Sequence, residues 1–244
     1  MQLYRKLFHR KGHGIHSPFV FDLVTNVIEQ PYPYYGYRDI DLIRLHLRLH
    51  DQAITWQDKQ SSIKKYLRNQ AISQKEGELL FRLANHYKPY DILTIGSSMG
   101  LAPLYLTGYS SHLHCISLES ETDIATIARR NIEKKTNSPI RLIQADYLTA
   151  LQETLQQFKR IDCLYLSKEL TIKTINAAYH QCLPFIHDET LLIVSGIHSS
   201  SEKRNFWTQL CNDPKITVSV DLYKLGLIFF RPKLHKRMYK CCMI

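Results

Sequence analysis

The chain has 244 residues, of which 44% are hydrophobic and 22% charged, an ordinary composition for a soluble globular protein. A chain of this length buries enough apolar surface to fold without a disulfide or a structural metal. No run approaches the roughly 20 apolar residues of a membrane span. The first residues also lack the apolar stretch of a secretion signal, so we expect a cytoplasmic protein.

The formal net charge of +10 is distributed unevenly. Residues 1–90 carry 14 basic and 8 acidic side chains, residues 91–230 carry 13 and 14, and residues 231–244 carry 5 and none. Basic ends of this kind occur in proteins that bind nucleic acid, an anionic membrane surface or an anionic substrate. A solvated surface that aids solubility explains the same charges, so they do not select a function.

Residues 1–88 are predicted to form a helical extension. Apolar positions follow helical spacing over residues 19–29 and 73–87, and a polar helical stretch begins at residue 39. A segment with two prolines and a glycine, residues 30–36, is typical of a turn.

The pattern changes at residue 89, where we expect a second domain that runs to residue 244. Short runs rich in Ile, Leu and Val alternate with helical segments, and the runs show little polar alternation. Strands that are buried on both faces of a parallel sheet have this pattern. The predicted strands cover residues 91–95, 113–118, 140–144, 161–166 and 190–194, and the helices between them cover residues 100–108, 121–135, 147–158 and 172–185.

Two further strand-like runs, residues 216–221 and 225–231, are separated by only three residues. A gap that short permits a hairpin and not a parallel crossover. The sequence therefore predicts an α/β, Rossmann-like sheet of seven strands with the last strand antiparallel. Cys241 and Cys242 follow in a basic tail that we expect to be free and exposed. The chain has no C-x-x-C pair, which argues against a zinc site.

A glycine-rich turn joins the first strand of this domain to its first helix. Gly96 and Gly100 enclose Ser97, Ser98 and Met99, and glycine there lets a ligand approach main-chain N–H groups closely. In a series of alternating strands and helices, nucleotide sites form at this first turn.

Glu119 strengthens that interpretation. It ends the second strand, 19 residues after Gly100, close to the spacing at which an acid accepts hydrogen bonds from ribose hydroxyls. The alternative is a surface acid at the start of the next helix, where Ser120 also suits the cap. Asp146, at the end of the third strand, is either an adenine contact or the N-cap of the following helix, and the two roles are compatible.

These residues resemble class I methyltransferases that depend on S-adenosylmethionine (SAM), and within them an O-methyltransferase-like group common in Bacteroidetes. Four segments carry the resemblance: residues 13–22, 92–100, 181–186 and 218–231. The resemblance implies SAM as cofactor and methyl transfer as activity. The cofactor-binding residues that it implies are Gly96, Ser97, Ser98, Gly100, Glu119, Ser120, Asp146, Tyr147 and Ser167.

The chain departs from the family at three positions. Thr94 stands where the family usually has Glu on the first strand. After the fourth strand, a stretch like Asp-Gly-Asn-His is replaced by Ser167-Lys168-Glu169, and after the fifth, Asp-Asp-Ile-His is replaced by Ser195-Gly196-Ile197-His198. Related enzymes hold Mg²⁺ or Ca²⁺ with acids at those two strand ends, and hard cations prefer carboxylate ligands. We therefore predict no catalytic metal.

Candidate bases for methyl transfer are His198, His16 and His13, each of which has a structural role as its alternative. Lys168 is a candidate for anchoring the acceptor. The leading hypothesis is a metal-independent methyltransferase for an unknown small-molecule or envelope-related acceptor. The alternatives are a catalytically weakened member that keeps SAM binding in a scaffold role, and a nucleic-acid methyltransferase.

Nucleic acid is the less favoured partner. Amino-methylating enzymes often carry an Asn/Asp-Pro-Pro-aromatic turn after the fourth strand, and this chain has Leu164-Tyr165-Leu166-Ser167 there. Analogy with the fold makes a homodimer possible. The sequence identifies neither the acceptor nor the role of the basic tail.

Overall fold

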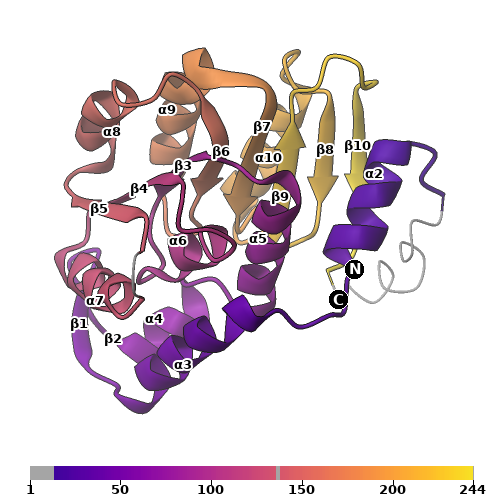
Figure 1. Ribbon diagram of the computed structural model, residues 1–244. Helices are drawn as coiled ribbons and strands as arrows, with labels where there is room; N and C mark the ends of the chain where they lie inside the picture. The colour runs from indigo at the N-terminus through magenta and orange to yellow at the C-terminus, as the bar shows by residue number, and fades with distance from the viewer. Residues whose placement is uncertain (1–13, 136–137, 244) are drawn as a thin grey trace.

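A computed structural model describes residues 14–135 and 138–243, and it shows an α/β fold built on one eight-stranded sheet (Figure 1). The strand order is β10-β8-β9-β7-β6-β3-β4-β5, and a separate two-stranded sheet pairs β1 with β2. No helix in these two ranges is long and apolar enough to cross a membrane. His13, one of the candidate bases, lies outside the described residues.

The seven predicted strands are all present. They are β3 (Asp91–Ile95), β4 (His114–Glu119), β5 (Ile140–Gln144), β6 (Ile161–Leu166), β7 (Ile186–Ser195), β8 (Val218–Asp221) and β9 (Leu225–Phe229). Strands β3 to β7 all run parallel to one another, whereas β9 runs antiparallel to both β7 and β8. The predicted fold class is therefore confirmed, as is the antiparallel orientation of β9, the last of the seven predicted strands.

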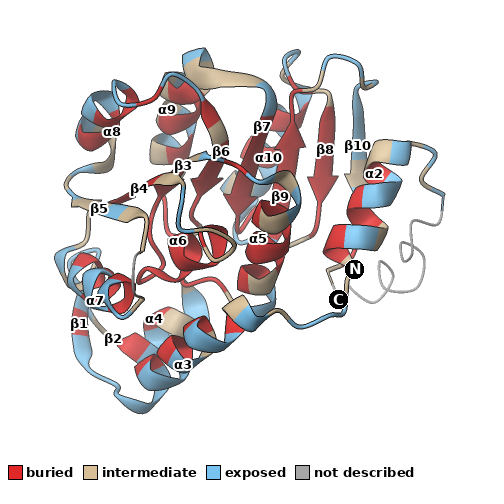
Figure 2. Cartoon of the chain, in the orientation of Figure 1, coloured by how far each residue is buried: buried red, intermediate tan, exposed pale blue. Residues whose placement is uncertain are grey.

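Both faces of the sheet are buried, which explains the continuous apolar runs. In β3, Leu93 and Ile95 belong to one hydrophobic cluster and Ile92 to the other, because successive side chains point to opposite faces. Helices α8 (Tyr147–Leu155), α9 (Ile172–Cys182) and α10 (Ser201–Asn212) cover the first face, and a short 3₁₀ turn, η2 (Leu183–Phe185), follows α9. Figure 2 shows the resulting buried sheet beneath helices whose outer sides are exposed.

The second face is covered by α6 (Leu101–Leu106), α7 (Thr122–Glu133) and the helices of the first 88 residues. These are α2 (Pro18–Leu23), a π-helical turn η1 (Val24–Ile28), α3 (Tyr35–Leu49), α4 (Ile63–Asn69) and α5 (Gln74–Tyr87). Ser73 caps α5 in a reciprocal capping box with Glu76. All of these helices share one hydrophobic cluster with the sheet.

A β-hairpin that the sequence does not predict lies against the start of α7 (Figure 1). Its strands are β1 (Ala53–Trp56) and β2 (Lys59–Ser62), and both turn residues between them have positive φ, as in a type I′ turn. The Thr55 N–H donates to Asp123 at 2.6 Å, and the Gln57 N–H donates to Glu121 at 3.0 Å. Because α7 directly follows β4, the hairpin lies close to Glu119.

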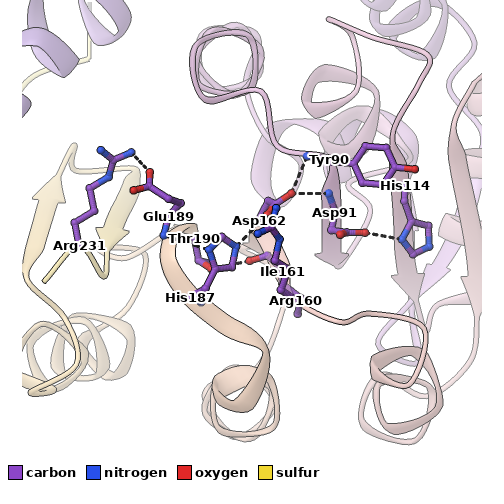
Figure 3. A network of polar contacts seen from close by, with 10 residues as sticks. All are labelled: Tyr90, Asp91, His114, Arg160, Ile161, Asp162, His187, Glu189, Thr190 and Arg231. Atoms are coloured by element: carbon purple, nitrogen blue, oxygen red, sulfur yellow. Dashed lines mark hydrogen bonds and ion pairs between the residues drawn. The ribbon is translucent and has the colours of Figure 1, made fainter.

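A polar network fixes the opposite, amino-terminal edge of the sheet (Figure 3). Asp162 accepts hydrogen bonds from the N–H groups of Tyr90 and Asp91, at 2.9 and 3.0 Å, and pairs with His187 at 3.0 Å. Asp91 in turn pairs with His114 at 2.9 Å. These contacts join the amino ends of β3, β4, β6 and β7, so they hold the sheet far from the glycine turn.

The basic tail is not free, which corrects the prediction. It forms β10 (Arg237–Lys240), which pairs parallel to β8 and adds an eighth strand to the sheet. Cys241 and Cys242 follow it and are 1% and 7% exposed. The prediction was wrong because the tail's charged residues gave no apolar strand signal, whereas pairing with β8 depends on backbone hydrogen bonds.

Candidate functional site

The glycine turn, residues 96–100, leaves β3 where the strand order changes direction, with β4 on one side and β6 on the other. Ligands of open α/β sheets bind outside the carboxyl ends of the strands at such a point. Ser98 and Met99 have φ of +51° and +59°, a left-handed conformation that costs about 1–3 kcal/mol for each non-glycine residue. Strain of this kind clusters at ligand sites.

Glycine is required at both ends of the turn. A Cβ atom at Gly96, where φ is +84°, would lie 2.4 Å from the Cβ of Ser167 and 2.6 Å from a carboxylate oxygen of Glu169. A Cβ at Gly100 would lie 3.0 Å from the backbone oxygen of Ala128. The first glycine therefore lets β3 and β6 end side by side, and the second lets α7 pack against the turn.

Glu119 is fully buried and receives five hydrogen bonds. Its Oε2 accepts from the N–H of Ser97 at 3.0 Å and from the Ser97 hydroxyl at 2.6 Å. Its Oε1 accepts from the N–H groups of Ser120 and Glu121, at 3.0 and 3.2 Å, and from the Tyr147 hydroxyl at 2.7 Å. A carboxylate offers about four lone-pair sites, so groups of the protein saturate it. Glu119 thereby ties the glycine turn to β4 and to α8.

Asp146 is exposed and caps α8. Its carboxylate accepts from the N–H groups of Thr149 and Leu148, both at 3.1 Å, and these hydrogen bonds, led by that of Thr149, lower its pKa. The capping alternative is therefore confirmed, while the adenine contact stays a prediction. Tyr147, one of the cofactor-binding residues that the resemblance implies, points its hydroxyl at Glu119.

Four buried hydroxyl groups lie at the carboxyl ends of β3, β6 and β7. They belong to Ser98, Tyr165, Ser167 and Ser195, and none has a hydrogen-bond partner of good geometry among the described residues. Burial raises the pKa of Tyr165, whereas the three serine hydroxyls nearby lower it. A buried hydroxyl without a partner costs about 1–3 kcal/mol, so the cluster is typical of a site that a polar ligand completes.

Glu169 is a buried acid. In the sequence it is notable only as the one carboxylate near the ends of the fourth and fifth predicted strands, β6 and β7. Its carboxylate accepts a hydrogen bond from the hydroxyl of Tyr66 on α4, and its other oxygen lies 3.5 Å from the N–H of Ser98. Burial raises the pKa of Glu169 to about 7, against the Ser98 N–H and the charge of Lys203, which lower it. Tyr66 is 103 residues away in sequence, and no pattern connects the two.

His198 lies just beyond the end of β7 and pairs with Asp221, the last residue of β8. Its Nε2 is 2.8 Å from the Asp221 carboxylate, and its Nδ1 is buried without a partner in the described part of the chain. Its ring stacks on that of Tyr223 at 5.1 Å. The sequence indicates the histidine but not Asp221, which reaches His198 only because β7, β9 and β8 are adjacent.

The structure does not bring His16 to this site. His16 is exposed, just before α2, and the nearby Phe19 packs against Phe229 with ring centroids 4.9 Å apart. Phe229 pairs with Leu191, at the end of the β7–β9 ladder that is remote from Ser195. Of the predicted residues, those that lie together are the glycine turn, Glu119, Ser120, Tyr147 and Ser167. His198 lies apart from them, beyond Ser195 at the end of β7.

Comparison with solved structures identifies the fold. An O-methyltransferase from Bacillus cereus, solved with S-adenosylhomocysteine (SAH), is 16% identical and superposes with a TM-score of 0.58 over 86% of this chain and 97% of its own. The O-methyltransferase TomG from Streptomyces achromogenes, solved with SAM and involved in tomaymycin synthesis, is 15% identical, with a TM-score of 0.60 over 82% and 91%. The chain has the methyltransferase fold.

A methyltransferase from Geobacter sulfurreducens gives the same result, with a TM-score of 0.60 at 16% identity over 83% of this chain and 92% of its own. No family model matches the chain, and no curated protein matches it in sequence. Structural likeness at this level of identity establishes the fold, while the chemistry depends on the residues of the site.

Proposed function

We propose that the protein is a SAM-dependent methyltransferase that acts on an oxygen of a small-molecule acceptor without a catalytic metal. The observation that carries the proposal is the strained glycine turn fastened to Glu119 at the switch point of the sheet. Two of the similar structures named above were solved with SAM or SAH, which supports the same cofactor here.

The proposed cofactor site uses the residues around the turn. Gly96, Ser97, Ser98 and Gly100 would lie along the methionine part, Glu119 and Ser120 at the ribose, Asp146 and Tyr147 at the adenine, and Ser167 beside the turn. The unpartnered hydroxyls of Ser98 and Ser167 suit a polar ligand. Ribose hydroxyls would reach Glu119 by taking the place of the Tyr147 hydroxyl on Oε1.

Glu169 would provide the negative charge for this end of the cofactor. SAM carries a sulfonium and an ammonium group against one carboxylate, so its methionine end has a net positive charge. One Glu169 oxygen lies 3.5 Å from the Ser98 N–H and would be 2.6 Å from a Cβ placed at Gly96, so this carboxylate packs against the turn along which the ligand would lie. The acid that the family has at Thr94 would thus be replaced by one from another strand end.

His198 is the proposed general base. Asp221 would hold the imidazole with its Nε2 protonated, which leaves a lone pair on Nδ1. SAM supplies a methyl group on a positively charged sulfur. Nδ1 of His198 would accept the acceptor's proton as the acceptor oxygen takes this methyl group and the electron pair of the carbon–sulfur bond goes to sulfur. The products are the methyl ether or ester and SAH.

The predicted metal independence rests on the donor atoms at the strand ends. Ser167, Ser195 and Gly196 supply no carboxylate, and hard divalent cations prefer several. Calorimetric titration with Mg²⁺ should therefore give no tight binding, and activity should survive EDTA. A micromolar Mg²⁺ site would contradict this part of the proposal.

The direct test of the cofactor site is SAH binding by the full chain, measured by calorimetry. Glu119→Ala should weaken SAH binding by at least about tenfold, because it removes hydrogen bonds to a charged group. Glu153→Ala, an exposed acid on α8, is the control and should bind normally. Equal affinity in both variants would refute the ribose assignment. Transfer of labelled methyl from SAM into cell extract separates an active enzyme from a SAM-binding scaffold.

We also propose that the protein works in the cytoplasm as a homodimer, with a domain boundary near residue 88. The apolar side chains of Leu42, Leu45 and Leu49 support the dimer, because they are 50–68% exposed on one face of α3. Light scattering should give twice the chain mass for the native protein. Leu45→Glu should then give a monomer, whereas a native monomer would refute the dimer.

A further inference from the structure

Two adjoining cavities lie beside the proposed catalytic histidine. The inner one, of about 220 Å³, is lined by His198, Gly196 and Lys168. The outer one, of about 390 Å³, is lined by Arg48 of α3, by the start of α5 and by the C-terminal residues 241–243. Both have Ser73, Tyr223 and Lys224 in their walls, so they are neighbours.

The inner cavity has the features of a reaction site. The buried Nδ1 of His198 has no partner in the described part of the chain, and the ring is held in place by Asp221 and by stacking on Tyr223. The Lys168 ammonium is already bonded to the backbone oxygen of Asn69. A ligand oxygen that entered this cavity would therefore meet a fixed imidazole.

Positively charged side chains from three separate parts of the fold line the outer cavity. Arg48 comes from the end of α3, Lys75 from the first turn of α5, and Lys224 from the turn between β8 and β9. Arg48 and Lys75 have no acidic oxygen within 4 Å in residues 14–135 and 138–243. The start of α5 adds the positive end of a helix dipole.

One carboxylate faces these charges, and it is already engaged. Glu76 accepts the N–H and hydroxyl of Ser73 at 2.8 and 2.5 Å, and Lys224 is 4.0 Å away. With Arg68 and Lys168, the two cavities together have five cations in their walls and one acid. Like charges that converge on one hollow repel each other until an anion enters, so the hollow attracts anions.

We infer that the acceptor is a small molecule with an anionic group, phosphate or carboxylate, bound between Arg48, Lys75 and Lys224 while its reacting oxygen reaches His198. This inference rests on the proposed methyl transfer and names its substrate class. A hollow of this size suits a small molecule. A nucleic-acid strand would instead need a basic groove that follows several nucleotides.

The test uses the full chain and calorimetry with two probes, inorganic pyrophosphate and citrate, at fixed ionic strength. Arg48→Gln/Lys75→Gln should weaken binding of the preferred probe by at least about tenfold. The matched control is Lys159→Gln/Lys173→Gln, which removes the same charge from exposed positions outside both cavities. The preferred probe distinguishes a phosphate-bearing from a carboxylate-bearing acceptor.

SAH affinity, measured on the same samples, should be equal in all variants. If SAH binds and neither probe does, the anionic acceptor is refuted while the proposed methyltransferase stands. Equal weakening in the control pair would also refute it, because net charge alone would then explain the binding. A ten-nucleotide DNA strand that bound more tightly than either probe, through the same two residues, would replace the small molecule by a nucleic acid. Failure of SAH to bind would refute the proposed function itself.

Discussion

Replacing Glu169 by glutamine should make the protein more stable at alkaline pH and leave it unchanged at acidic pH. The substitution removes the charge of a buried carboxyl and keeps its size and an oxygen for the Tyr66 hydroxyl. Burial raises the pKa of this carboxyl from 4.5 to about 7. The folded protein therefore keeps a proton that the unfolded chain has lost between these pH values.

The direction and size of the stability change follow from this difference in protonation. Because the pKa is raised in the folded state, the stability contributed by this group is complete below pH 4.5 and is lost as the pH rises through 7. A pKa difference of about 2.5 corresponds to about 3 kcal/mol of unfolding free energy. At pH 8 the variant should therefore be more stable than the native protein by about 3 kcal/mol, and at pH 4.5 the two should be nearly equal.

Urea denaturation at pH 5, 6, 7 and 8 measures this effect as the difference between variant and native protein. The difference cancels the other titrating groups, which the two proteins share. Glu153→Gln, at an exposed position on α8, is the control and should give a difference that does not change with pH. A Glu169→Gln difference that is equally independent of pH, or a variant that loses stability relative to the native protein as the pH rises, would show that burial does not raise the pKa of this carboxyl.

The remaining predictions concern the turn, the ribose edge, the cofactor charge and the tail. Gly96→Ala should lower unfolding free energy by about 3 kcal/mol through steric overlap and positive φ, and an unchanged melting temperature would contradict this. Tyr147→Phe should tighten SAH binding because it frees Oε1 of Glu119 for the ribose. Weaker binding in calorimetry would contradict this. SAM affinity should rise from pH 6 to 8 as Glu169 ionises, and an affinity that does not change with pH would show that Glu169 does not bind the cofactor. Cys241 and Cys242 should react slowly with a thiol reagent until urea is added, whereas rapid native labelling would mean that the tail is exposed.

The sheet is well predicted because its signals are local. Leu93 and Ile95 face one layer of helices and Ile92 the other, so burial on both faces requires an uninterrupted apolar run. The glycine turn and the acid 19 residues after it are equally local, because both follow the ends of consecutive strands. The hairpin at residues 53–62 was not predicted because its strands are only four residues long, the second strand is polar, and its turn, Gln57-Asp58, lacks the usual glycine.

By itself, the sequence determined the α/β class, the antiparallel strand at residues 225–229, the position of the turn and the absence of acids at Ser167 and Ser195. Only the tertiary structure decided which distant groups meet these features. The Tyr66–Glu169 contact and the His198–Asp221 pair join residues from different elements, so their geometry depends on strand order and helix packing. The basic cavity beside His198 has the same origin, since its charges come from three elements and converge only when the chain is folded.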